Sequence, residues 1–113
     1  MPKLTKETRI SRERERLMKI FSGIDENKLN VVAPLIDRAA FITISLEELE
    51  SDLNRDGWVE AYTNGANQGG VKKSAAADCH ISLTKNLNAI TKQLLDIVPP
   101  AQRRSKLDEL KNE

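Results

Sequence analysis

The sequence predicts a mainly α-helical protein: an N-terminal helix, then a long antiparallel helical hairpin whose connector forms a short β-hairpin. Apolar residues recur at spacings of three and four over residues 35–53 and again over residues 76–97, as they do along one face of a helix. Four of the five glycines lie between these stretches, at residues 57–70. Only 4% of the residues are aromatic, which is typical of helical seams lined by aliphatic side chains.

The charge distribution divides the chain into three segments. Residues 1–20 carry a net charge of +4, residues 21–60 carry −6, and residues 61–113 carry +3. Such unevenness suggests different partners for different parts of the chain. We therefore expect a basic N-terminal helix at residues 1–24, a helical hairpin that forms the core and the oligomerisation region at residues 25–98, and a polar C-terminal tail at residues 99–113.

The first helix is expected to begin after Thr5 and to run to about Ser22. The Thr5 hydroxyl can accept a hydrogen bond from a backbone N–H of the first turn, and Gly23 is a favoured helix terminator. The apolar residues of this helix that share one face, and so predict its contact with the core, are Ile10, Leu17 and Phe21.

The second helix is expected to follow an Asp25 cap, with an interruption at Pro34. Proline in a helix interior removes a backbone donor and clashes with the preceding turn, at a cost of about 3 kcal/mol. We therefore expect a kink or break near residues 32–33 and a helix over residues 34–55. Gly57 is the predicted stop of that helix.

The connector has the pattern of an irregular β-hairpin. Residues 58–63 alternate in side-chain type, Asn64-Gly65 and residues 67–70 are turn formers, and residues 71–73 form a short return strand.

Ser74 is the expected cap of this last long helix, which runs to about Val98. Pro99 and Pro100 end it, because proline cannot continue a helix. The polar tail that follows is either one short helix or a disordered segment. The sequence does not choose between the two.

The two apolar seams are expected to face each other and to leave part of their surface for other copies of the chain. A core in a chain of this length is modest, so oligomerisation is a common route to stability. The residues predicted to form this oligomer seam are Leu46, Leu49, Leu53, His80, Leu83, Leu87, Ile90 and Leu94.

No arrangement of residues predicts catalysis, a metal site or a cofactor site. The single cysteine, Cys79, adjoins the single histidine, and neighbours in a helix point about 100° apart. A structural zinc site needs about four such ligands. The connector glycines lack the motif of a phosphate loop. The carboxylates predict either a solvated helix face or a docking surface for a basic partner; they are Glu47, Glu48, Glu50, Asp52 and Asp56.

The basic N-terminal helix is the candidate DNA-binding surface, with a plain solvated helix as the alternative. Lysine and arginine side chains contact phosphates without reading the base sequence. Three glutamates interrupt the basic residues, and no helix-turn-helix pattern is evident. The candidate contacts are Lys3, Lys6, Arg9, Arg12, Arg14, Arg16 and Lys19.

Residues 30–107 contain a series of motifs in a fixed order. An acidic helix ends at Asp56-Gly57, a hairpin with Asn64-Gly65 follows, and the stretch 70–77 leads to residues 94–107. In this order the segment resembles the small terminase subunits of tailed phages. One group of those proteins has a Lys-x-Pro helix start and a Leu-Gly-Leu-x-Pro segment followed by arginines. The chain departs from it at residues 73–75, which lack the proline, and at residues 95–97, which read Leu-Asp-Ile; the positions that fit are Pro99, Arg103 and Arg104.

The resemblance implies a non-enzymatic, ring-forming subunit of a DNA-packaging motor. Its partners would be viral double-stranded DNA at the packaging site, further copies of itself, and the large terminase subunit that carries the ATPase and nuclease. The alternative is a helical protein-interaction adaptor or small transcription regulator. We expect a location in the host cytoplasm and no membrane partner, since no apolar run approaches the ~20 residues of a membrane span.

Overall fold

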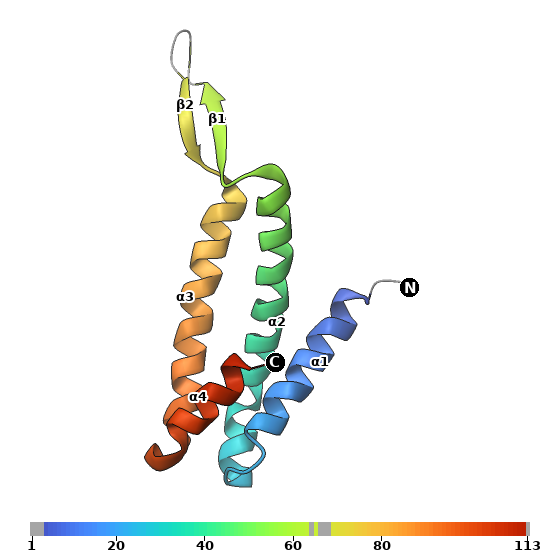
Figure 1. The fold of residues 1–113 in the computed structure, drawn as a ribbon, viewed down its shortest axis with the longest axis vertical. Coiled ribbons are helices and arrows are strands. Elements are labelled where there is room, and N and C mark those ends of the chain that lie inside the picture. Colours follow the sequence, from blue (N-terminus) through green and yellow to red (C-terminus); the bar gives the residue numbers. More distant parts are fainter. Residues whose placement is uncertain (1–3, 64, 66–68, 113) are drawn as a thin grey trace.

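The computed structural model describes residues 4–63, 65 and 69–112 and confirms the mainly α fold with a β-hairpin connector (Figure 1). Lys3 and part of the predicted turn, Asn64 and residues 67–68, lie outside the described residues. In chain order the elements are α1 (Lys6–Ile20), α2 (Glu26–Asp56), β1 (Val59–Thr63), β2 (Gly69–Lys73), α3 (Ala75–Asp96), the 3-10 helix η1 (Pro100–Gln102) and α4 (Arg103–Lys111).

The elements form an elongated molecule with extents of 62 × 37 × 22 Å. Helices α2 and α3 lie side by side as the central hairpin, and the β1–β2 ribbon projects beyond their joined ends (Figure 1). Helices α1 and α4 lie toward the opposite end, where α1 packs against α2 and α4 folds back against α1 and α3.

The hydrophobic core lies at the end of the molecule away from the ribbon. Phe21 and Ile36 are fully buried there, together with Leu94 from α3 and Val98 just after it. Burying a side chain of this size contributes about 1.5–3 kcal/mol. The core therefore depends on residues of the N-terminal helix as well as on the central hairpin.

All three predicted N-caps are confirmed. The side chains of Thr5 and Ser74 each accept a backbone N–H three residues along the chain, with a distance of 3.1 Å in both cases. Asp25 accepts the backbone N–H of Asn27 at 2.7 Å. Each cap satisfies a donor that the first helical turn would otherwise leave without a partner.

Of the predicted kink or break near residues 32–33, a break and a helix start at residue 34 were wrong, because α2 continues through Pro34 as one helix of 31 residues. Proline removes a single donor from the helix, and the ring of Pro34 is exposed. Val32 and Ile36, on either side, are buried in the core. Their burial, at about 1.5–3 kcal/mol each, offsets the cost of one proline.

The ends of the first two helices differ from each other in how they use glycine. Helix α1 ends at Ile20 with Phe21 as its cap, so Gly23 does not terminate it as predicted. Gly57 does end α2 as predicted, and its N–H donates to the Leu53 carbonyl oxygen at 2.8 Å. Its φ of 91° and ψ of 163° lie in a region that is essentially confined to glycine.

Replacing Gly57 by alanine is expected to lower the free energy of unfolding by about 1–3 kcal/mol, because the added Cβ strains this backbone conformation. Gly23→Ala is the matched control: an added Cβ there meets nothing within 4 Å, and the residue is not at positive φ. That control should be neutral or stabilising by about 0.4–1 kcal/mol. Urea unfolding measures the free energy of unfolding of both variants. Equal losses would contradict the conclusion that Gly57 has a backbone conformation that strains any other residue.

The connector is a two-stranded antiparallel sheet in which β1 pairs with β2 from Val59↔Lys73 to Thr63↔Gly69. The return strand therefore begins at Gly69, two residues earlier than predicted. All ten strand residues are exposed. The ribbon accordingly adds nothing to the core.

The tail folds back as helix α4, which decides between the two alternatives that the sequence left open. Helix α3 ends at Asp96, two residues before the predicted Val98. The Arg103 guanidinium donates to the Val98 carbonyl oxygen at 3.0 Å and to the Asp96 carbonyl oxygen at 3.2 Å. One of the arginines that carried the family resemblance therefore closes the end of α3.

Helix α2 is long and apolar enough to cross a membrane, with a mean hydropathy of 1.5 over 18 residues. This differs from the expectation that no run approaches such a length. The core helix of a soluble protein passes the same test, and 39% of this window is buried inside the molecule. The hydropathy of α2 is therefore weak evidence for a membrane span.

Candidate functional site

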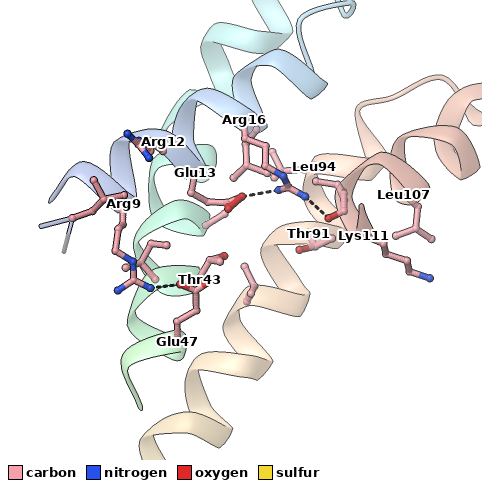
Figure 2. A pocket seen from close by; sticks show the side chains of 16 residues that line it. Arg9, Arg12, Glu13, Arg16, Thr43, Glu47, Thr91, Leu94, Leu107 and Lys111 are labelled. Carbon is pink, nitrogen blue, oxygen red and sulfur yellow. Dashed lines mark hydrogen bonds and ion pairs between the residues drawn. The ribbon is translucent and has the colours of Figure 1, made fainter. Parts of the chain in front are cut away.

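A groove with a volume of about 790 Å³ lies between α1, α2, α3 and α4 (Figure 2). Its floor is apolar and buried, with Leu17, Ile44 and Leu94 from three different helices. Its walls include the half-buried leucines Leu87, Leu107 and Leu110. The groove can therefore accept apolar groups without first unfolding any part of the chain.

The rim of the groove is basic. Arg9, Arg12 and Arg16 lie along α1, and Lys111 lies across from them on α4 (Figure 2). Two acidic residues, Glu13 and Glu47, also line it. The rim thus carries a net charge of +2 beside an apolar floor.

Arg16 links α1 to the end of α4. Its guanidinium donates to the Leu110 carbonyl oxygen at 2.6 Å and to the Asn112 carbonyl oxygen at 3.1 Å, and it pairs with Glu13 at 2.6 Å. A cation at this position satisfies free carbonyls at a helix C-terminus and interacts well with the helix dipole.

Lys106 makes the reciprocal contact. Its ammonium donates to the carbonyl oxygen of Ile20, the last residue of α1, at 2.7 Å. Each of the two helices thus supplies a cation to the C-terminal end of the other. This pair of contacts holds α4 in place as one wall of the groove.

Three further cations of α1 pair with carboxylates of α2. Lys6 lies 2.8 Å from Glu48, Arg9 pairs with Glu47, and Arg14 pairs with Asp37. The side chains are partly exposed, so each pair contributes at most about 1 kcal/mol. Of the two interpretations of the acidic residues, Glu47 and Glu48 match docking to a basic partner, and that partner is α1 of the same chain.

The structure therefore divides the predicted DNA contacts into two groups. Four of the seven, Lys6, Arg9, Arg14 and Arg16, pair with carboxylates within the chain, and Lys3 lies outside the described residues. Arg12 and Lys19 are exposed and have no ion-pair partner in the described part of the chain. The opposite charges of residues 1–20 and 21–60 were a signal of this pairing.

Half of the predicted oligomer seam is buried within one chain. Leu46, Leu53, Ile90 and Leu94 are buried in the monomer, with exposed fractions of 8% or less. The seam residues that are only partly buried, and so can still contact another copy, are Leu49, His80, Leu83 and Leu87.

His80 lies at the junction between the central helices and the ribbon. Its Nε2 is 2.9 Å from a carboxylate oxygen of Glu50, and its ring meets the Trp58 ring edge-on with centroids 5.3 Å apart. It therefore links α3, α2 and the base of the ribbon, and it lies away from the groove lining.

Clear pKa shifts occur in one exposed pair at the end of α2, away from the groove. Hydrogen bonding from Arg55 lowers the pKa of the Asp56 carboxyl, and the same bond raises the pKa of the Arg55 guanidinium. Solvent screens both groups. Across residues 4–63, 65 and 69–112, no three His, Cys, Asp or Glu side chains are grouped so as to hold a metal ion.

The tail residues of the site were missed by sequence reasoning. Leu107 and Leu110 line the groove, and Lys106 and Arg103 fix the position of α4. The spacing of three between the two leucines was the only local signal. Their contacts with α1 and α3 depend on the direction in which the chain turns after Pro99.

The arrangement suits binding. An apolar floor beside fixed cations can take an amphipathic helix or position phosphates at the rim. No family model matches the chain, and no match was found among curated proteins or solved structures.

Proposed function

We propose that this chain is a small terminase subunit of a tailed phage: an oligomeric, ring-forming protein that binds viral DNA at the packaging site and regulates the large ATPase and nuclease subunit. The observation that carries the proposal is the resemblance over residues 30–107, in which Gly57 lies directly after α2 and Pro99 lies shortly after α3. Such placement is expected where a motif specifies the fold.

Some residues of these motifs have a definable physical role in the fold. Gly57 ends α2 in a conformation confined to glycine. Pro99 precedes the turn η1, and Arg103 closes the carbonyl end of α3. This supports the proposal, because three residues that fit the family pattern, Gly57, Pro99 and Arg103, lie where the two long helices end.

The DNA-binding surface is assigned to cations that remain exposed. Arg12 on α1 and Lys111 on α4 both line the groove, and neither has an ion-pair partner among the residues that the structure describes. Lys19 lies further along α1. Arginines already paired with carboxylates release fewer counterions on DNA, so they contribute less to affinity.

The double variant Arg12→Glu/Lys111→Glu is expected to weaken binding to double-stranded DNA by at least about tenfold. It should also make the dependence of log K on log salt shallower by about 2, because two phosphate contacts are lost. Fluorescence anisotropy at several salt concentrations measures both quantities.

The matched control is Lys85→Glu/Lys92→Glu, which makes the same change in net charge at exposed positions of α3. Its salt dependence should stay at the wild-type value. Equal losses in the two double variants would show that only net charge matters, and wild-type protein that is a strict monomer by light scattering and ignores DNA would refute the proposal.

A helical protein-interaction adaptor is the second candidate, favoured by a specific observation. The groove has leucine walls, and four of the described α1 cations are already neutralised within the chain. Such a surface fits an amphipathic helix of a partner protein. Salt titrations that detect no DNA affinity in the wild-type chain would favour this adaptor.

A further inference from the structure

The β1–β2 ribbon presents an apolar face that no part of the described chain covers. Val59 is 57% exposed and Val71 is 68% exposed, and they lie on the same face as Ala61 because Ala61 pairs with Val71. A lone two-stranded ribbon is only marginally stable in water. An additional strand would therefore stabilise it.

The opposite face of the ribbon is already satisfied within the chain. The Tyr62 ring covers Gly70, where an added Cβ would lie 3.0 Å from the Tyr62 hydroxyl oxygen. Lys72 lies 3.6 Å from Glu60 and 5.9 Å from the centre of the Tyr62 ring. The parts of the ribbon that remain available for contact with a partner are therefore its strand edges and its apolar face.

The hydrogen-bond pattern identifies which backbone groups are free at the β1 edge. The Ser74 N–H donates to the Trp58 carbonyl oxygen at 3.0 Å, next to the Val59↔Lys73 pair. Hydrogen-bonded and non-hydrogen-bonded pairs alternate along an antiparallel ladder, and Trp58 with Ser74 is a hydrogen-bonded pair. The N–H and C=O groups of Val59, Ala61 and Thr63 therefore point away from β2. These three residues form an edge ready to accept another strand.

The two edges differ in their protection against pairing. Strand β2 carries Lys72 and Lys73 beside two glycines, and lysines on an edge are a common device against edge-to-edge association. Strand β1 reads Val-Glu-Ala-Tyr-Thr, with no lysine, glycine or proline, and three of its residues have high β propensity. β1 is therefore the edge open to a partner.

We propose that β1 pairs antiparallel with β1 of a second copy of this chain, with the two-fold axis at Ala61. In this register Ala61 faces the partner's Ala61, and Val59 faces the partner's Thr63. Glu60 faces the partner's Tyr62, so no two like charges are opposed. The four-stranded sheet places Val71, Ala61 and their partner equivalents in one apolar row across one face.

This contact goes beyond the proposed function. It is isologous, whereas a ring requires head-to-tail contacts made by other surfaces. It would join two chains, or two rings, through their ribbons. Loss of the contact should leave DNA binding at Arg12 unchanged, so the two proposals fail separately.

Disulfide trapping in a Cys79→Ser background tests the register. Ala61→Cys is expected to give a covalent dimer on a non-reducing denaturing gel after mild oxidation. Directly opposed, hydrogen-bonded residues have Cα atoms about 5.5 Å apart, which suits a disulfide. Val59→Cys alone should stay monomeric, because its two copies would lie about 14 Å apart along the strands at about 3.4 Å per residue.

A mixture of the Val59→Cys chain with a Thr63→Cys chain is expected to give a covalent dimer, since the register places these two residues opposite each other. All three positions are exposed, so the variants should keep the wild-type circular dichroism. Dimers of Val59→Cys with itself would indicate parallel strands or an antiparallel register with the two-fold axis at Val59, and dimers of Val71→Cys would indicate pairing through β2. Either result, or an Ala61→Cys chain that stays monomeric at high protein concentration, overturns the proposal.

Discussion

Replacing Phe21 by alanine is expected to lower the free energy of unfolding by about 3–5 kcal/mol. The side chain is fully buried, and it lies just after α1 in the core shared with α2 and α3. Its removal leaves a cavity and withdraws apolar area from the contact between α1 and the central hairpin. Because domains of this kind are stable by about 5–15 kcal/mol, a large part of the total would be lost.

Phe41→Ala is the matched control, since it deletes the same side chain at a position that is 51% exposed. Phe41 contacts the Lys6 ammonium, which lies 5.0 Å from the ring centre. The loss there should be about 1 kcal/mol or less. Urea unfolding measures the free energy of unfolding of both variants, and the comparison holds if their m-values equal the wild-type value. Similar losses of free energy in the two variants would contradict the position of the core.

Replacing Arg16 by methionine is expected to release α4 from α1. The variant keeps an apolar stem but loses the bonds to the carbonyl oxygens of Leu110 and Asn112. Hydrogen bonds to a charged group contribute about 1.5–3 kcal/mol. Backbone amides of α4 should therefore exchange about 10- to 100-fold faster, while those of α2 should change much less.

Arg14→Met provides the control for this release. The Arg14 side chain is 46% exposed and pairs with Asp37 on α2, and it makes no hydrogen bond or ion pair with α4 in the described part of the chain. In this variant the hydrogen exchange of the α4 backbone amides should stay at the wild-type rate. A uniform acceleration across all helices in the Arg16 variant would show instead that the whole fold had been destabilised.

The local elements were predictable because their signals are local. Thr5, Asp25 and Ser74 cap helices through bonds to residues two or three positions away, and Gly57 ends α2 through its own backbone conformation. The β1–β2 ribbon was predictable from the alternation of side-chain types along residues 58–63 and from the glycines of the turn. Such interactions depend on sequence spacing alone.

Pro34 shows where local rules are insufficient. The local cost of a proline predicted a kink or break, yet α2 continues as one helix, and Val32 and Ile36 beside Pro34 are buried in the core. The residues that cover Val32 and Ile36 lie far away in the sequence, so a rule about the positions around a proline does not include them. Tertiary packing therefore decided the length of this helix.

The sequence by itself determined the helix–ribbon–helix order, the caps, and an opposite charge on the first two helices. Only the tertiary structure decided that α1 uses its cations on α2, and that α4 turns back to complete a groove beside Arg12. The physical reason is that ion pairs and packing between helices depend on their mutual direction and rotation. These are set by many weak long-range contacts together, and no single stretch of the chain encodes them.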